Sequence, residues 1–267
     1  MLQVTIPAYN AEETIAAAVE SCLNPGVNAV VVVDDKSTDS TPDVIRKLAG
    51  KDSRVRGIVL SRNVGQYAAC NTAFAHSAPP GVVDYYMMLD SDDINAPERV
   101  VKTLDAFAAD PDLMIVSGQM ESIDQDGNKK GGSYKNLPED PATVLQRQSR
   151  HVLINGVMTF RRRVLDVLGG YEAASGGADT EFIYRAYYAC LKMRNLKDVL
   201  GYRRVHSGQC TSATQTDPER AAYRTKIAGA WTWWRALKLR GRLQQEHLRI
   251  NPVTAPIAEF IGTTGSR

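Results

Sequence analysis

Apolar segments alternate with amphipathic segments along the first 110 residues of the chain. The apolar segments are short and rich in Val, Ile and Leu, a composition typical of parallel strands that are covered on both faces. Strands are therefore expected within residues 2–10 and at residues 28–35, 55–60 and 82–90. Helix-start and helix-stop signals between them predict helices at residues 10–23, 40–50, 65–78 and 96–110. This regular alternation predicts an open, mostly parallel α/β sheet flanked by helices.

Individual residues set the expected limits of these elements. The first strand is expected to stop at Pro7, and Asn10 is expected to cap the first helix, with Glu13 three residues later as its capping-box partner. Asn95 is the expected cap of the fourth helix. The core face of that helix is expected to comprise Val100, Val101, Leu104 and Phe107.

The pattern changes after residue 112. Residues 113–135 are expected to form two strands joined by a turn at Asp126 and Gly127. The next expected elements are a strand and a short helix at 156–171, a helix at 179–193 and a strand at 198–206. From residue 218 to residue 250 the chain is expected to form one or two basic helices.

The length and composition are those of a globular protein. A chain of 267 residues with 43% hydrophobic and 23% charged residues can form one large domain or a domain with an appendage. We predict a domain over residues 1–215, with halves at 1–112 and 113–215, and a helical extension over 216–267. The sequence shows no apolar run of about 18 residues and no basic signal-peptide region. A cytoplasmic location is therefore expected, with the four cysteines as isolated reduced thiols.

The net charge of +2 conceals an uneven distribution. Residues 203–249 carry ten Lys or Arg against three Asp or Glu, a net charge of +7, and the same segment contains all three Trp. Such a segment could lie at a membrane surface, giving peripheral association, or bind nucleic acid. The alternative is a helix that packs its Trp residues on the main domain and exposes a solvated basic face.

Carboxylates are concentrated directly after the fourth expected strand. Asp90 and Asp92 flank Ser91, and residues two apart in extended backbone point to the same side. Both carboxylates can therefore face one ligand, and a hard cation such as Mg²⁺ or Mn²⁺ prefers oxygen ligands of this kind together with substrate phosphates. The alternative is that the cluster caps the following helix, a role for which Asn95 is already available.

Other nucleotide and metal motifs are excluded by their spacing. The acidic segments lack the glycine of a calcium-binding EF-hand loop at position six. The first strand is not followed by GxGxxG, and the chain has no Walker A sequence. A second acidic pair, Asp34 and Asp35, ends the second strand in "VVVVDDKSTDST" and could hydrogen-bond a base edge and a ribose, or serve as turn and helix-cap chemistry.

The motifs, taken in order, resemble family 2 of the glycosyltransferases. The resemblance rests on "IPAYN", "VDDKSTDST", "RNVGQYAACN" and "LDSDD", continues in "GGYEAASGGADTEFIYR" and "YRRVHSGQCTS", and covers roughly residues 2–212. It implies a GT-A fold: an open, mostly parallel nucleotide-binding sheet flanked by helices, with a mixed acceptor-side half and a helical C-terminal appendage. It also implies an enzyme that transfers a hexose from a nucleotide-diphosphate sugar with inversion at the anomeric carbon.

The resemblance implies a role for individual residues. The nucleotide would contact Pro7, Ala8, Tyr9, Asp35, Asn63, Gly65, Asp90 and Ser91. A metal ion would bind Asp92, with His206 as a further metal or phosphate contact. The catalytic base would be Asp179. Secondary candidates in the same motifs are Glu181, Arg185 and Arg204.

Two positions depart from the family pattern. Lys36 stands where many members have Gly after the acidic pair, so the turn there is expected to differ. Ala178 stands where many members have Glu before the Asp of the base motif. Glu181 is therefore an alternative base, although its position favours packing within the helix or pairing with Arg185.

The expected chemistry follows from the carboxylates as well. Breaking a sugar–phosphate bond requires charge stabilisation of the diphosphate, which a divalent metal supplies, and the acceptor hydroxyl requires a nearby base. The leading hypothesis is an inverting, metal-dependent transferase that uses a UDP-sugar. A nucleotidyltransferase and a non-catalytic sugar-nucleotide or nucleic-acid binding module are the alternatives. The acceptor could be a glycan, a lipid-linked saccharide or a hydroxylated nucleic-acid base.

Overall fold

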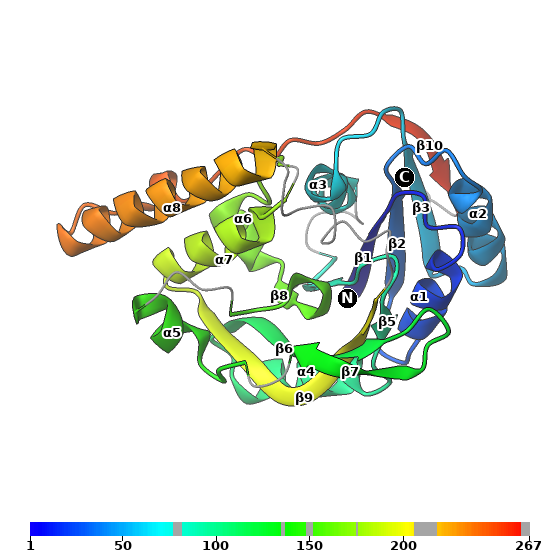
Figure 1. Ribbon diagram of the computed structural model, residues 1–267, viewed down its shortest axis with the longest axis horizontal. Helices are drawn as coiled ribbons and strands as arrows, with labels where there is room; N and C mark the ends of the chain where they lie inside the picture. Colours follow the sequence, from blue (N-terminus) through cyan, green and yellow to red (C-terminus); the bar gives the residue numbers. More distant parts are fainter. Residues whose placement is uncertain (77–81, 135–136, 148–151, 175, 206–217, 263–267) are drawn as a thin grey trace.

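The computed structural model of the protein describes residues 1–76, 82–134, 137–147, 152–174, 176–205 and 218–262. Within these residues, ten strands form one continuous sheet (Figure 1). The strand order is β10-β3-β2-β1-β4-β8-β6-β9-β5, and β7 pairs with β6. The sheet thus joins the two expected halves of the chain at the contact between β4 and β8.

The N-terminal half forms the expected parallel sheet. Its strands are β1 (Leu2–Ala8), β2 (Ala29–Asp34), β3 (Val55–Leu60) and β4 (Tyr85–Met88). Its helices are α1 (Ile15–Cys22), α2 (Thr41–Lys51), α3 (Gln66–His76) and α4 (Arg99–Ala109). All four strands are parallel, and β1 lies between β2 and β4. The strand order therefore reverses at β1, where parallel α/β sheets form a ligand-binding crevice.

Helices cover both faces of this sheet. Side chains of α1, α2 and α4 pack with Val4, Ile6, Val30 and Val32 on one face. On the other face, Ala69 and Ala73 of α3 pack against Val31, Val33, Ile58 and Leu60. Because β2 is buried on both sides, its run of four Val residues needs no polar alternation, as the sequence pattern predicts.

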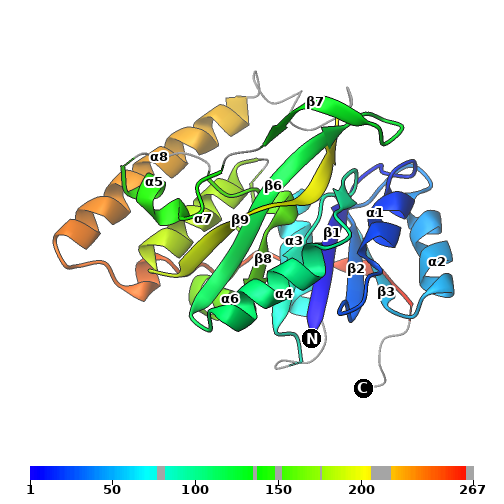
Figure 2. The ribbon, with the colours of Figure 1, turned by 90° about the horizontal axis from the view of Figure 1, so that it is seen from below.

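The C-terminal half is mixed. Its strands are β6 (Leu113–Ile123), β7 (Lys129–Tyr134), β8 (Thr159–Arg161) and β9 (Lys192–Arg204). The short strand β5 (Ile94–Asn95), from the N-terminal half of the chain, pairs antiparallel with β9. Its helical elements are α5 (Pro141–Arg147), the 3₁₀ turn η1 (Asn155–Val157), α6 (Arg163–Leu168) and α7 (Ala178–Tyr188). Figure 2 shows the long strands β6 and β9 running side by side, and these two strands pair in parallel.

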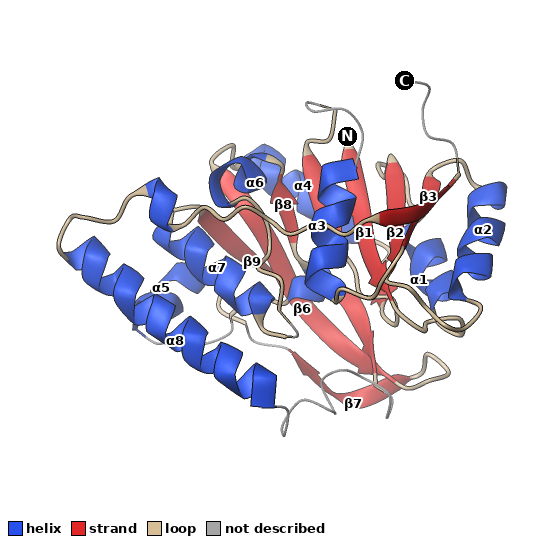
Figure 3. Ribbon diagram, turned by 90° about the horizontal axis from the view of Figure 1, so that it is seen from above, coloured by secondary structure: helices blue, strands red, loops and turns tan. Residues whose placement is uncertain are grey.

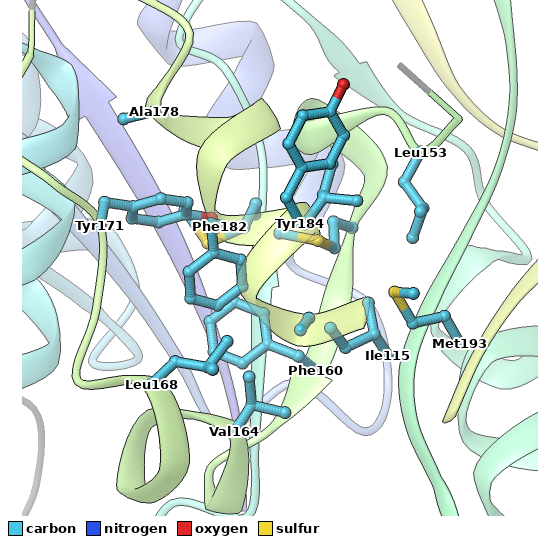
Figure 4. Close-up of a cluster of buried hydrophobic side chains, with 14 of the residues drawn as sticks. Ile115, Leu153, Phe160, Val164, Leu168, Tyr171, Ala178, Phe182, Tyr184 and Met193 are labelled. Carbon is cyan, nitrogen blue, oxygen red and sulfur yellow. The ribbon is translucent and has the colours of Figure 1, made fainter. Parts of the chain in front are cut away.

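An aromatic core fixes α7 on the sheet. Phe182 of α7 packs on Tyr171 with ring centroids 4.7 Å apart and on Phe160 of β8 at 5.7 Å. Val164 and Leu168 of α6 complete this cluster (Figure 4). A rigid aromatic core of this kind fixes the position of the first turn of α7, which carries Asp179.

The C-terminal segment differs in part from the helical extension that the sequence predicts. Helix α8 (Pro218–Leu239) and the 3₁₀ turn η2 (Gln245–His247) are helical, but the chain then returns across the molecule and adds β10 (Ile257–Ile261) to the sheet (Figure 3). Strand β10 pairs antiparallel with β3 and thereby covers the edge of the parallel part of the sheet. No helix in the described part of the chain is long and apolar enough to span a membrane.

Four local expectations are wrong. Strand β1 runs through Pro7 to Ala8, because its pairing with β4 has already ended at Thr5 and the missing N–H of Pro7 removes no bond on that side. Asn10 does not cap α1: it bonds to Thr38, and Thr14 takes the cap position. Asn95 lies in β5, so Glu98 precedes α4. Val101 is 58% exposed.

Candidate active site

The predicted nucleotide residues lie at the carboxyl ends of adjacent strands. Pro7 and Ala8 end β1, and Tyr9 directly after them is 50% exposed. Asp35 follows β2, and its N–H donates to the Ala8 carbonyl at 2.8 Å. The two strand ends are therefore joined, with the Tyr9 ring exposed beside them as a platform on which a base could stack.

The Ser and Thr residues after Asp35 organise the loop that follows β1. The Asn10 amide oxygen accepts the Thr38 N–H at 2.9 Å, and the Ser37 hydroxyl accepts the Asn10 N–H at 2.9 Å. The Thr41 hydroxyl accepts the Ala11 N–H at 2.8 Å. Most residues of "KSTDST" therefore form the hydrogen bonds that hold this turn and loop. Lys36 keeps the left-handed conformation, with φ of +63°, that a glycine would adopt more easily.

Asp35 joins the end of β2 to the loop that precedes α3. Its two carboxylate oxygens accept the N–H groups of Val64 and Gly65 at 2.8 and 2.7 Å, and the Asn63 side chain donates to the Asp35 carbonyl at 3.1 Å. Burial raises the pKa of the Asp35 carboxyl, although the two N–H donors oppose that shift. Three predicted nucleotide residues, Asp35, Asn63 and Gly65, are thus brought together by direct contacts.

The acidic cluster forms a tight turn after β4. Asp90, Ser91 and Asp92 remain partly exposed, whereas Asp93 is buried. Burial, followed by repulsion from Asp92 and Asp179, raises the pKa of Asp90 to about 7. Burial and the Asp90 charge likewise hold the pKa of Asp93 well above its usual range. The charges of Arg203 and Arg99 oppose the shift at Asp90 but do not cancel it.

Gly156 in η1 leaves room for this cluster. A methyl group at Gly156 would lie 3.0 Å from Asp90 Oδ2 and 3.5 Å from Asp93 Oδ2. The absence of a side chain at this position therefore lets the two carboxylates approach the backbone of η1.

Two buried arginines hold the backbone around the cluster. The Arg204 N–H donates to Asp93 Oδ1 at 3.0 Å, and its side chain donates to the Asp92 carbonyl at 3.0 Å. Arg99, at the start of α4, donates to the carbonyls of Met88 at 2.8 Å and of Gly156 at 3.3 Å. These contacts join β4, β9 and η1 around the acidic turn, so Arg204 acts on the scaffold of the site.

Asp179 approaches the same region from α7. Its Oδ1 accepts the Tyr67 hydroxyl at 3.1 Å and the Thr180 N–H at 2.8 Å. Burial, followed by the Asp179 charge, holds the pKa of Tyr67 well above its usual range, so its hydroxyl remains a donor. Asp179 lies near enough to Asp90 for its charge to raise the pKa of that carboxyl, so the start of α7 lies close to the acidic turn.

Glu181 faces away from this site into the protein. It forms a bidentate ion pair with Arg185, at 2.6 and 2.8 Å. Arg185 is 1% exposed and also donates to the carbonyls of Leu168 and Gly170, at 2.7 and 2.6 Å. The expected pairing of Glu181 with Arg185 is confirmed, and both side chains hold α7 against the segment after α6.

Comparisons with known proteins agree with this architecture. The family model described as Glycosyl transferase family 2 matches residues 3–169. The chain belongs to glycosyltransferase family 2. It is 28% identical over 222 residues to a chondroitin synthase of Escherichia coli, which covers 81% of this chain and 30% of that protein. It is 36% identical over 142 residues to a hyaluronan synthase of Pasteurella multocida, covering 52% of this chain and 14% of that protein.

Solved structures show the same fold. S. aureus TarS 1–349 in complex with UDP-GlcNAc aligns with a TM-score of 0.69 and 21% identity over 92% of this chain and 68% of that one. The mannosyltransferase PcManGT from Pyrobaculum calidifontis, in complex with GDP-Man and Mn²⁺, aligns with a TM-score of 0.58 and 21% identity over 79% and 59%. The GT-A-type architecture expected from the sequence of this family 2 member is therefore confirmed.

The carboxylates of the acidic turn fit a hard divalent cation. Within the described residues, no three carboxylate, imidazole or thiol side chains form a complete metal site. Mg²⁺ and Mn²⁺ in nucleotide enzymes take one or two carboxylates and complete their shell with phosphates and water. Asp92 and Asp90 offer that number of carboxylates on one partly exposed turn. His206, the other predicted ligand, lies outside the described residues.

Sequence reasoning missed three residues that organise this candidate site. Tyr67 lies within a quoted motif but carries no separate signal, because a Tyr in a buried helix is usually a core residue. Gly156 carries no separate signal because it is one of 20 glycines in the chain. Arg99 did carry a signal: a cation in the first turn of a helix opposes the helix dipole, which indicates that another interaction holds it there.

Proposed function

We propose that the protein transfers a hexose from a UDP-sugar to an acceptor hydroxyl, with a divalent cation and with inversion at the anomeric carbon. The observation that carries this proposal is the convergence of Asp90 and Asp92, at the end of β4, with Asp179 at the start of α7. A cation-binding carboxylate pair and a separate base are the two parts that a single displacement requires.

Each part has a defined task in the proposed reaction. The Asp179 carboxylate accepts the proton of the acceptor hydroxyl while that oxygen forms a bond to C1 of the sugar. The bond between C1 and the diphosphate oxygen breaks, and UDP leaves from the opposite face. Asp92 and Asp90 would hold the cation, which when bound supplies positive charge to the departing diphosphate. Tyr67 and the Thr180 N–H keep the Asp179 carboxylate in place.

The residues at these strand ends support a nucleotide donor. The exposed Tyr9 ring and the hydrogen-bonded group of Asp35, Asn63 and Gly65 lie at the strand-order reversal beside β1. A nucleotide in that crevice would direct its diphosphate towards the acidic turn after β4. TarS, which binds UDP-GlcNAc and UDP in its structures, supports UDP as the nucleotide of this chain.

We expect UDP binding to depend on a divalent cation. Without one, the diphosphate would meet Asp90 and Asp92 directly, and like charges repel. Calorimetry of UDP with Mn²⁺ and with EDTA should show at least about tenfold weaker binding in EDTA, which corresponds to ~1.4 kcal/mol. Asp92→Asn should lose most of this Mn²⁺ effect, whereas Asp105→Asn, on the exposed side of α4, should keep it. Equal UDP affinity in Mn²⁺ and in EDTA would contradict the cation assignment.

We further propose that the acceptor is anionic and meets the basic C-terminal segment. Trp234 is buried and Trp231 packs partly on the core, so two of the three Trp residues are structural. Trp233 is 50% exposed, and exposed cations such as Arg235, Arg240 and Arg242 lie near it in sequence. A glycan, lipid headgroup or nucleic acid with negative charge fits this surface better than a neutral acceptor does.

Acceptor affinity should therefore fall as salt concentration rises. Each ionic contact with a phosphate-bearing acceptor releases counterions, so several contacts give a steep logarithmic dependence on salt. Kinetic measurement of the acceptor KM between low and high NaCl tests this, with the donor KM as internal control. A variant with Arg235, Arg240 and Arg242 replaced by Gln should show a shallower slope. An acceptor KM that does not change with salt would refute the anionic acceptor.

A further inference from the structure

Helix α8 packs directly on the segment that leads to Asp179. A Cβ at Gly176 would lie 3.1 Å from Arg220 Nε, and one at Gly177 would lie 3.4 Å from Ile227 Cδ1 and 3.6 Å from Tyr223 Cδ1. Arg220, Tyr223 and Ile227 are spaced i, i+3 and i+7, so they share one face of α8. This face covers the backbone of the two glycines immediately before α7.

Glu172 fixes the same segment to α8 by charge. Its Oε2 accepts the Tyr223 hydroxyl at 2.8 Å and the Lys226 ammonium at 2.8 Å. Burial alone would raise the pKa of Glu172, but the bonds from Lys226 and Tyr223 hold it below its usual value. The Glu172 side chain is 24% exposed, so water screens this ion pair less than it screens a fully exposed ion pair.

The start of the segment is anchored separately. The Asn71 side chain on α3 donates to the Tyr171 carbonyl at 2.8 Å and accepts the Tyr171 N–H at 2.9 Å. Tyr171 is therefore fixed to α3, while Glu172, Gly176 and Gly177 are fixed to α8. Gly177, with φ of +88°, is the N-cap residue of α7, so its position sets the first turn that carries Asp179.

We propose that Tyr223, Lys226 and Glu172 are positioning residues for the catalytic base, and that α8 is part of the catalytic unit although it contacts no reacting atom. This inference rests on the proposed role of Asp179. The contact holds the backbone of Gly176 and Gly177 so that the Asp179 carboxylate meets the acceptor hydroxyl in a reactive geometry. All of these residues lie beyond residue 169, where the family match ends.

The proposal predicts a loss of turnover without a loss of donor binding. Because a displacement of about 1 Å can reduce a rate by roughly 10²-fold, we expect Tyr223→Phe and Lys226→Met each to lower kcat by about tenfold to 10²-fold. The UDP affinity in Mn²⁺ should stay unchanged, because the nucleotide pocket lies on other elements. Glu172→Gln, which keeps an acceptor for Tyr223, should lose less kcat than Glu172→Ala.

Matched controls separate positioning from general stability. Tyr187→Phe, at the other end of α7, and Lys197→Met, 88% exposed on β9, should leave kcat unchanged. Thermal melting of every variant shows whether it is folded at the assay temperature. Wild-type kcat in folded Tyr223→Phe and Lys226→Met would overturn the proposal.

A double-variant cycle tests whether the effect passes through the base. If Tyr223 acts only through Asp179, Tyr223→Phe should cause no further loss in an Asp179→Asn background. A further loss equal to that of the single variant would show that α8 acts elsewhere, which overturns the proposal while leaving the base assignment intact. Full transfer by Asp179→Asn alone would instead refute the proposed function.

Discussion

Replacing Asp179 by Asn is expected to abolish sugar transfer and to leave UDP-sugar binding nearly intact. The amide keeps the shape of the side chain, and its oxygen can still accept the Tyr67 hydroxyl and the Thr180 N–H. It cannot accept a proton from the acceptor hydroxyl. Since a positioned base contributes about 10² to 10⁴ in rate, the loss of kcat should reach at least that range. Single-turnover transfer measures the rate, and calorimetry with Mn²⁺ measures donor affinity.

Comparison with Asp92→Asn separates the base from the cation site. That variant should weaken both Mn²⁺-dependent UDP binding and turnover, because its carboxylate would hold the cation and not the acceptor proton. Asp105→Asn, exposed on α4, makes the same change of charge outside the site and should alter neither quantity. If Asp179→Asn transferred sugar at the rate of the unsubstituted protein, the single displacement with a base from α7 would be wrong.

The sequence predicts the sheet and the edge that carries the site because those features are local. Apolar runs without alternation indicate buried parallel strands, and the end of each run marks a residue at the carboxyl edge. Asp35 and Asp90 could therefore be placed at one edge without coordinates. The ordered motifs then identified Asp179 as a candidate base, although it lies 89 residues after Asp90 in the chain.

What the sequence could not predict depends on contacts between distant segments. Strand β10 pairs with β3 across about 200 residues, and nothing in "IAEFI" names its partner. Tyr67 reaches Asp179 only because α3 and α7 cover the same face of the sheet. Asn10 offers the best helix-cap residue in its segment, yet tertiary bonds to the loop after β2 use that side chain instead.

Replacing Glu181 by Gln is expected to produce the largest loss of stability among single substitutions near the site. The variant would leave the Arg185 guanidinium, 1% exposed, without its counter-charge. Removing one partner of a buried ion pair costs about 3–5 kcal/mol. At roughly 2–4 °C per kcal/mol for a large domain, the midpoint of thermal unfolding should fall by on the order of 10 °C. Differential scanning calorimetry measures that shift.

An exposed pair with the same spacing is the matched control. Asp166 lies four residues after Arg162 on the surface, 59% exposed, with the charged atoms 3.9 Å apart. Asp166→Asn should change the free energy of unfolding by less than about 1 kcal/mol, because water screens that pair. The contrast would show that burial, and not the spacing of the charges, makes the Glu181–Arg185 pair important.

The same variant decides between Glu181 and Asp179 as the base. Burial raises the pKa of the Glu181 carboxyl although Arg185 opposes that shift, and its oxygens are directed to Arg185 inside the core. Assayed well below its unfolding midpoint, Glu181→Gln should therefore transfer sugar at nearly the unsubstituted rate. If it lost transfer while its unfolding midpoint stayed unchanged, Glu181 would be the base, and the carboxylate held by Tyr67 would serve another purpose.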